Sequence, residues 1–219
     1  MRGKSADAPK KMSLAGAQHK LLVVLKQGQL FEPLGGTPST HILKPQHQSD
    51  DYPSSVINEY FAMRLAKMMG LDVPHVERGY VPEPVYLIER FDRQVGPDGQ
   101  IRRLHVIDTC QLLNKSLGFK YKAANVEALQ EVIKMCRGPA AARQRLFEWL
   151  TFNVLIGNGD NHLKNISFMV DKEGIRVAPT YDLLSTTAYE TRAIANDRGV
   201  WPQSELAFSF GQIKRFSDV

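Results

Sequence analysis

The chain has 219 residues, enough for one domain or two small lobes. Its composition, with 43% hydrophobic and 23% charged residues, is typical of a globular protein with a buried core. Its net charge of +5 suits a polyphosphate ligand or an acidic partner but does not by itself indicate nucleic-acid binding. No apolar run approaches the ~20 residues of a membrane span, and the basic N-terminus lacks the hydrophobic stretch of a signal peptide, so we expect a cytoplasmic protein without membrane contact.

The first part of the chain predicts a flexible arm followed by paired strands. Residues 1–11 are polar and basic without apolar periodicity, which favours a flexible arm. The small residues of Ser13–Lys20 (SLAGAQHK) lead into an apolar run, Leu21–Leu25, that reads as a strand. A second strand is expected at Ser39–Lys44, after the turn at Gly35 and Gly36. Together they predict a β-hairpin with a small-residue loop at its mouth.

The middle of the chain predicts a helix, a strand and a boundary. Ile57–Met69 has helical spacing of apolar residues and is followed by Gly70, a common residue after a helix C-terminus. Val85–Glu89 is predicted to be a strand, and Pro97-Asp98-Gly99 a turn. We therefore expect an α+β fold with two lobes. Residues 12–93 would form a small β-rich N-lobe and residues 94–219 a helical C-lobe.

The second half is expected to be mainly helical. The helices predicted there span Asp108–Leu113, Val126–Cys136 and Ala140–Leu155. A short hairpin is expected from Ile166–Val170 and Ile175–Ala178, and the end from Ala188 onward is weakly patterned. The two cysteines, Cys110 and Cys136, are far apart and without metal-site spacing, which favours buried thiols in a reducing compartment.

One stretch, LIGNGDNHLKN at Leu155–Asn165, has the residue types of a phosphoryl-transfer site. An Asp followed five residues later by an Asn is the spacing of the protein-kinase catalytic loop, where the Asp takes the acceptor proton and the Asn holds Mg²⁺. Asp182, after the second predicted hairpin strand, would be the second metal ligand. Two other interpretations remain open: Asp160 as a turn-capping residue, and zinc bound by Asp160, His162 and Asp182.

Residues in the first half could complete such a site. Lys44 ends a predicted strand, and Glu59 on the following helix could pair with it, as a strand Lys pairs with a helix Glu in protein kinases. Small side chains in the loop before residue 20 would let backbone N–H groups approach phosphate oxygens, and Lys20 adds a positive charge. The segment Glu89-Arg90-Phe91 could present backbone groups to adenine with Phe91 as an apolar wall.

Taken together, seven stretches resemble the HipA family of bacterial serine/threonine kinases, the toxins of toxin–antitoxin modules. They occur in the order of the family: SLAGAQHK, THILKP, NEYFAMRLAKMMGLDVP, LIERFDR, DTCQLL, IGNGDNHLKN and APTYDLLST. The resemblance implies a two-lobed, protein-kinase-like fold and a serine/threonine protein kinase that uses ATP and Mg²⁺. It also implies a protein substrate, often an aminoacyl-tRNA synthetase, inhibition of translation, and neutralisation by a HipB-like DNA-binding antitoxin, through which any DNA contact would be indirect.

The resemblance also assigns residues. Asp160 is implied as the catalytic base, Asn165 and Asp182 as metal ligands, Glu59 as a supporting residue and Ser13 as the regulatory autophosphorylation site. A phosphate on Ser13 would be repelled by the triphosphate and would inactivate the kinase. The role of Gln111, which matches a recurrent family position, is not implied. The ATP-binding residues implied are Ala15, Gly16, Ala17, Gln18, His19, Lys20, Lys44, Glu89, Arg90, Phe91, His162, Leu163, Lys164, Asn165 and Asp182.

The chain departs from longer family members at both ends. Only a short arm precedes the phosphate loop, as in the compact HipT-like toxins whose missing subdomain is a separate small protein, or as in a truncated chain. The C-terminus stops before several further helices of the family. Two other functions therefore stay open at this stage: an inactive fragment that serves as a nucleotide-binding or regulatory interaction module, and a metal-dependent hydrolase that uses Asp160, His162 and Asp182.

Overall fold

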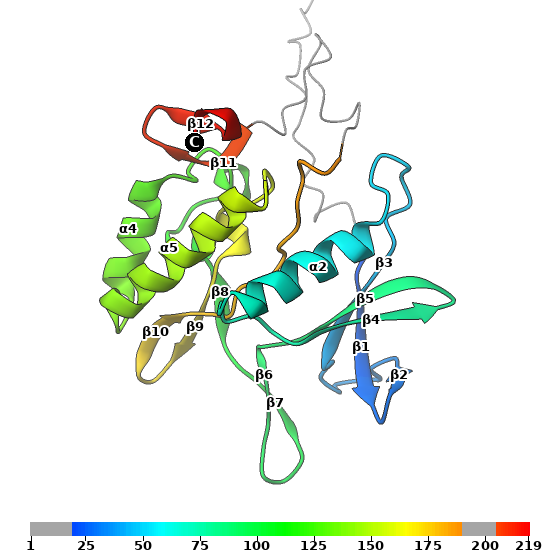
Figure 1. The fold of residues 1–219 in the computed structure, drawn as a ribbon. Coiled ribbons are helices and arrows are strands. Elements are labelled where there is room, and N and C mark those ends of the chain that lie inside the picture. The colour runs from blue at the N-terminus through cyan, green and yellow to red at the C-terminus, as the bar shows by residue number, and fades with distance from the viewer. Residues whose placement is uncertain (1–18, 190–204) are drawn as a thin grey trace, which may run out of the picture.

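The structure is a computed structural model that describes residues 19–189 and 205–219. It is a mixed fold in which a five-stranded antiparallel sheet lies beside a part built of helices and smaller sheets (Figure 1). The predicted phosphorylation site Ser13 and the loop residues Ala15–Gln18 lie outside the described residues, as does segment 190–204.

The five-stranded sheet carries the first half of the site. Its strands are β1 (Leu21–Lys26), β2 (Gln29–Phe31), β3 (His41–Pro45), β4 (Val76–Val81) and β5 (Glu83–Glu89), in the order β2-β1-β3-β5-β4. Gln27 and Gly28 both have positive φ and form the tight turn between β1 and β2. The predicted pairing of the first two strands is present between β1 and β3. They are not a simple hairpin, because β2 intervenes and pairs with β1 as well.

Alternation along the strands decides which side chains face the helix α2 (Ser55–Met68). Ile42 and Lys44 on β3 lie opposite Ile88 and Tyr86 on β5. Apart from Lys44, these residues pack in one cluster with the buried face of α2, whereas Leu43 and its neighbours form a smaller cluster on the other side of the sheet. Because of this alternation, the Lys44 side chain lies on the face of the sheet that α2 covers, and it is buried between β3 and α2.

A hairpin that the sequence did not predict follows the sheet. Strands β6 (Arg93–Val95) and β7 (Ile101–Arg103) flank the predicted Pro97-Asp98-Gly99 turn and project from the body of the molecule (Figure 1). Each strand has only three residues and is largely exposed, so no alternating apolar pattern marks it.

The second half surrounds α5 (Pro139–Leu155), whose buried face includes Leu146 and Trp149. Phe168 packs into this core and is fully buried. The surrounding elements are β8 (Val106–Asp108), α3 (Thr109–Leu112), η1 (Leu117–Phe119), α4 (Val126–Met135), η2 (Leu163–Asn165), β9 (Ser167–Asp171) and β10 (Gly174–Val177). Both cysteines are buried free thiols in this core, which confirms the predicted burial.

The second half contains more strands than the sequence predicted. It holds a three-stranded sheet, β10-β9-β8, and a C-terminal hairpin of β11 (Glu205–Phe210) and β12 (Ile213–Arg215), followed by η4 (Phe216–Asp218). The β9–β10 hairpin was predicted, but β8 is short and pairs with a strand about 60 residues away, which local patterns do not reveal. In β11, Phe208 is buried edge-on against Trp149, with ring centroids 5.3 Å apart.

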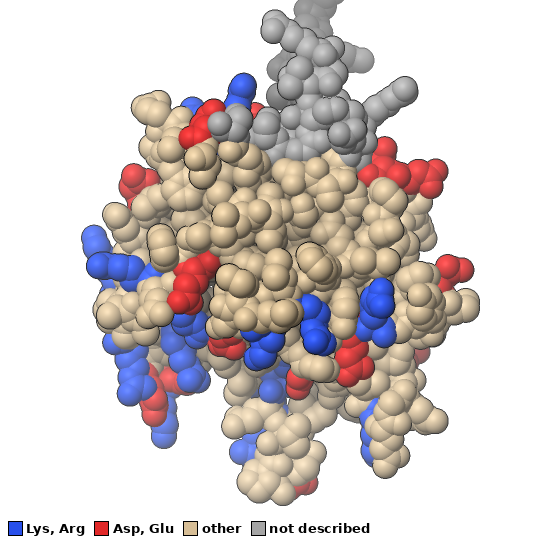
Figure 2. All heavy atoms as spheres, viewed as in Figure 1, with Lys and Arg blue, Asp and Glu red and all other residues tan. Residues whose placement is uncertain are grey.

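The surface of this half carries charges of both signs. In Figure 2, basic side chains are most numerous over α4, α5 and β10, and acidic side chains lie among them. Three arginines of these elements or of the turn between α4 and α5 form ion pairs, Arg137 with Glu173, Arg145 with Asp72 and Arg176 with Asp171. The positive charge on this face is therefore partly neutralised. None of the described helices is long and apolar enough to cross a membrane.

Candidate nucleotide and catalytic site

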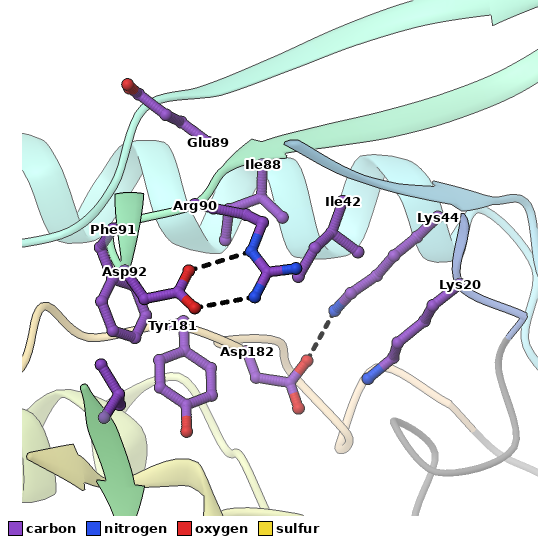
Figure 3. A pocket seen from close by; sticks show the side chains of 11 residues that line it. Lys20, Ile42, Lys44, Ile88, Glu89, Arg90, Phe91, Asp92, Tyr181 and Asp182 are labelled. Atoms are coloured by element: carbon purple, nitrogen blue, oxygen red, sulfur yellow. Dashed lines mark hydrogen bonds and ion pairs between the residues drawn. The ribbon is translucent and has the colours of Figure 1, made fainter. Parts of the chain in front are cut away.

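A pocket of about 220 Å³ lies between the five-stranded sheet and the second half of the chain (Figure 3). One end is apolar and the other is charged. The apolar end is lined by Ile42, Ile88, Phe91, Val106 and Tyr181, and the charged end by Lys20, Lys44 and Asp182. An apolar slot that leads to converging charges has the right character for a flat heterocyclic base followed by phosphates.

Aromatic residues and an ion-pair network hold the apolar end. The Phe91 and Tyr181 rings are stacked, with centroids 5.6 Å apart and planes inclined by 27°. The Tyr181 hydroxyl donates to the Lys164 carbonyl oxygen at 2.9 Å, and burial raises its pKa, so it remains a neutral donor. Arg90 makes two hydrogen bonds to the Asp92 carboxylate, at 2.9 and 2.7 Å. These contacts fix the chain as it leaves β5.

Lys44 is the centre of the charged end. Its Nζ lies 2.5 Å from Glu59 Oε1 on α2 and 2.7 Å from Asp182 Oδ1. All three residues are buried. The expected partner Glu59 is therefore present, and a second carboxylate joins the pair. Lys20, which also lines this end of the pocket, is a second positive group close enough to act on both carboxylates.

The pKa values of this triad follow from burial and from the shared ammonium group. Burial lowers the pKa of Lys44, but Asp182 and Glu59 outweigh it, so that pKa lies above its usual value. Burial raises the pKa of Asp182, but Lys44 outweighs it and lowers that pKa to about 2. For Glu59 the effect of burial prevails and its pKa is raised. At neutral pH Lys44 is charged and Asp182 is an ionised candidate metal ligand.

Asp182 has a backbone conformation that is unusual for a residue with a side chain. Its φ is +60°, in the left-handed region. Such strain persists where the surroundings fix it, and it often occurs at functional sites. In Figure 3 the Asp182 carboxylate points toward Lys44 and the charged end of the pocket. Among the described residues, none donates a hydrogen bond to its second oxygen, Oδ2, which is therefore a candidate metal ligand.

The loop after α5 is fixed by its turn residues. Asn158 Nδ2 donates to Asn153 Oδ1 at 2.7 Å, and Asn158 Oδ1 accepts from the Asp160 backbone N–H at 3.1 Å. The turn is thus capped by Asn158 and not by the Asp160 carboxylate, in contrast to the turn-capping interpretation of Asp160. Asp160 is buried, and the Tyr121 hydroxyl donates to its Oδ1. The Asp160 carboxylate therefore has a hydrogen-bond partner outside the turn.

Gly157 sets the path of this loop, and its replacement by alanine should be costly. Its φ is +67°, and an added Cβ would collide with the Thr187 side chain. We expect Gly157→Ala to reduce the free energy of unfolding by about 2 kcal/mol or more, from left-handed strain and steric conflict. Chemical denaturation measures this loss. Gly36→Ala is the matched control, since no heavy atom lies within 4 Å of its added Cβ; equal losses in both variants would contradict this account.

The residues after Asp160 bind the loop to its surroundings. The Asn165 side-chain N–H₂ donates to the Asp160 carbonyl oxygen at 3.1 Å, which leaves Asn165 Oδ1 as a candidate metal ligand. Lys164 Nζ pairs with Asp108 at 2.6 Å. His162 is buried, and burial lowers its pKa, so it is neutral at pH 7. The described residues offer no partner to its Nδ1.

Gln111, for which the sequence implied no role, caps the start of helix α3. Its side-chain Oε1 accepts from the Asp108 N–H, and its own N–H donates to the Asp108 carboxylate, both at 2.8 Å. This is a capping box at the start of α3. Because Asp108 also pairs with Lys164, the box helps to position the segment that follows the candidate base.

The structure brings together many, but not all, of the predicted site residues. Lys20, Lys44, Arg90, Phe91 and Asp182 line the pocket. The Glu89 side chain points away from the pocket (Figure 3), and its backbone N–H donates to the His75 carbonyl oxygen at 2.9 Å. Leu163 is fully buried and serves as a core residue, and His19 is exposed before β1.

Sequence reasoning missed several residues of the site. Tyr181 directly precedes Asp182, and its position next to a candidate ligand was a usable signal. Asp92 lies in the stretch LIERFDR but was not assigned a role, and Tyr121 and Val106 come from segments without a recognisable pattern that only the fold brings to the site.

The geometry gives no support to a hydrolytic metal centre. Across residues 19–189 and 205–219, no three His, Cys, Asp or Glu side chains are arranged to hold a metal ion. A zinc site of Asp160, His162 and Asp182 would need such a group. Carboxylate and amide oxygens such as those of Asn165 and Asp182 are of the type that Mg²⁺ prefers, since it takes few protein ligands and completes its shell with water and phosphate.

The chain matches one protein family along nearly its whole length. The model of the HipA-like C-terminal domain covers residues 12–217. The serine/threonine-protein kinase toxin HipA of Shewanella oneidensis is 34% identical over 97% of this chain and 52% of its own length. Y4mE of Sinorhizobium fredii, whose name describes a kinase, is 40% identical over 82% of this chain and 43% of its own. The chain thus spans about half the length of these curated relatives.

Solved structures agree with this assignment. The Shewanella oneidensis HipA in a complex with HipB and operator DNA superposes with a TM-score of 0.83 at 31% identity, over 97% of this chain and 50% of that one. The kinase CtkA of Helicobacter pylori superposes with a TM-score of 0.53 over 74% of this chain and 53% of its own. At 17% identity, the second similarity concerns the fold alone.

Proposed function

The chain belongs to the family of HipA-like C-terminal domains, and on that premise we propose that it is an ATP-dependent serine/threonine protein kinase, the toxin of a toxin–antitoxin pair. The observation that carries the proposal is the buried Lys44 between Glu59 and Asp182 at the charged end of the pocket. A strand Lys held by a helix Glu is the element that positions ATP phosphates in protein kinases. Residues 12–93 and 94–219 would be the two lobes around the nucleotide.

The proposed binding mode divides the pocket between base and phosphates. Adenine occupies the apolar end beside Phe91 and Tyr181. Its polar edge meets backbone groups of residues 89–91 other than the Glu89 and Arg90 N–H groups, which already donate to the His75 and Thr40 carbonyl oxygens. Lys44 and Lys20 hold the phosphates, together with backbone N–H groups of residues 15–19. The aromatic walls and two lysines support this orientation.

The proposed reaction is a direct transfer of the γ-phosphoryl group. The acceptor hydroxyl oxygen attacks the γ-phosphorus, its bond to phosphorus forms, and the bond to the β,γ-bridging oxygen breaks, so that ADP leaves. Asp160 orients the hydroxyl and accepts its proton. Asn165 and Asp182 would hold Mg²⁺, which neutralises phosphate charge when it is bound. The protein contributes mainly by positioning and electrostatic stabilisation.

Several finer assignments are proposals that come from the family. The substrate would be a protein, with an aminoacyl-tRNA synthetase as the first candidate, and its phosphorylation would inhibit translation in the cytoplasm. Autophosphorylation would occur on Ser13. A HipB-like DNA-binding antitoxin would neutralise the toxin, as HipA of Shewanella oneidensis occurs with HipB and operator DNA, and a separate small N-subdomain protein is a further candidate partner.

Incubation with ATP and Mg²⁺ tests the proposed function. We expect phosphate on Ser13, detected by mass spectrometry of proteolytic fragments, and no phosphate when EDTA removes the metal, because Asn165 and Asp182 act through it. Labelled ATP in a cell lysate would then identify the protein substrate. Nucleotide binding without any phosphate transfer would instead support a binding or regulatory module.

A further inference from the structure

A tyrosine outside all the predicted motifs touches the candidate base. The Tyr121 hydroxyl donates a hydrogen bond to Asp160 Oδ1. Its ring packs edge-on against His162, with centroids 5.0 Å apart, and Lys120 Nζ lies 4.9 Å from the centre of the same ring. Tyr121 thus contacts both the base and the residue two positions after it.

The backbone holds Tyr121 in this position. The Leu163 N–H donates to the Lys120 carbonyl oxygen at 3.1 Å, which joins the tyrosine segment to the catalytic loop. On the other side, the Ser209 N–H donates to the Ala124 carbonyl oxygen at 3.3 Å, which joins the segment to β11. The Ala124 N–H donates to the Tyr121 carbonyl oxygen at 3.0 Å. The tyrosine is therefore held between two fixed elements, and its hydroxyl reaches Asp160 from a set direction.

From this arrangement we propose that Tyr121 is a positioning residue of the kinase reaction, an inference that rests on the proposed function. Its hydrogen bond holds the Asp160 carboxylate in the rotamer in which the acceptor hydroxyl is oriented. A carboxylate that has to be ordered in every catalytic cycle is a poorer base than one already held in place. The tyrosine proton stays on the tyrosine during the reaction, and the acceptor proton passes to Asp160. In this role Tyr121 acts through Asp160, and it is not among the residues that line the nucleotide pocket.

The variant Tyr121→Phe separates this role from a structural one. It keeps the ring against His162 and removes only the hydroxyl. The measurement is the rate of phosphate incorporation into the full 219-residue chain as a function of ATP concentration, at fixed protein and Mg²⁺ concentrations. We expect the maximal rate to fall about 10- to 100-fold, the size expected for a hydrogen bond to a charged group. The half-saturating ATP concentration should stay within about twofold, since Tyr121 does not line the nucleotide pocket.

The matched control is Tyr80→Phe on β4, where the side chain is 74% exposed. It should leave both parameters unchanged. If Tyr121→Phe has the wild-type maximal rate, or if its rate falls together with its melting temperature, the positioning role is wrong while the kinase function stands. If the wild-type chain transfers no phosphate at all, the proposed function itself fails and the role of Tyr121 falls with it.

Discussion

Replacement of Asp160 by asparagine is expected to reduce phosphoryl transfer by about 10³-fold, within the range that a positioned general base contributes. Asparagine has nearly the same shape as aspartate and still accepts a hydrogen bond from Tyr121. It cannot, however, take up the proton of the substrate hydroxyl group. The contacts of the Asp160 backbone with Asn158 and Asn165 do not involve the carboxylate. The fold should therefore survive the change.

The comparison needs three measurements on each variant: the transfer rate, the ATP dissociation constant and the melting temperature. For Asp160→Asn only the rate should change substantially, because Asp160 is not among the residues that line the nucleotide pocket. The exposed Asp50 provides the control Asp50→Asn, which should alter none of the three. A fully active Asp160→Asn would remove Asp160 from the mechanism.

Replacement of Lys44 by methionine should affect both stability and function. Methionine fills similar space but leaves Glu59 and Asp182 buried without their cation. Removing one partner of a buried ion pair typically costs about 3–5 kcal/mol, because the remaining charge is uncompensated. ATP binding should weaken as well, since the pocket loses a phosphate-binding charge. Denaturant unfolding and nucleotide titration measure the two effects separately.

A double variant separates the loss of stability from the loss of function. In Lys44→Met with Glu59→Gln, one buried carboxylate is neutralised, so most of the lost stability should return while ATP binding stays weak. Lys67→Met, at an exposed lysine of α2, is the control and should change neither property. If Lys44→Met is as stable as the wild-type protein, the three groups do not form the charge cluster described above.

The sequence revealed the charged half of the site better than the apolar half. Lys44, Glu59, Asp160 and Asp182 are polar residues next to clear strand, helix and turn signals, and the fold buries all four. The adenine end is lined by ordinary apolar residues such as Ile42 and Val106, which no local pattern distinguishes from core residues. Their role depends on which faces of β3 and β8 meet across the pocket.

The fold was predictable where periodicity is strong. Helix α2 and strand β5 lie within two residues of their predicted bounds, because an amphipathic pattern and a following Gly70 mark the helix and a continuous apolar run marks the strand. The hairpins β6–β7 and β11–β12 were missed. Their short, partly exposed strands are stabilised by pairing and by contacts such as Phe208 on Trp149, which lie far apart in the sequence.

The central claim is that the site built around Lys44, Asp160 and Asp182 transfers the γ-phosphoryl group of ATP. The most direct measurement compares ATP labelled at the γ-phosphate with ATP labelled at the α-phosphate, each incubated with the purified chain. We predict that γ-label becomes covalently attached to protein only when Mg²⁺ is present, and that α-label does not. Covalent attachment of the α-label would contradict the claim. So would the absence of any attached label at saturating ATP and Mg²⁺.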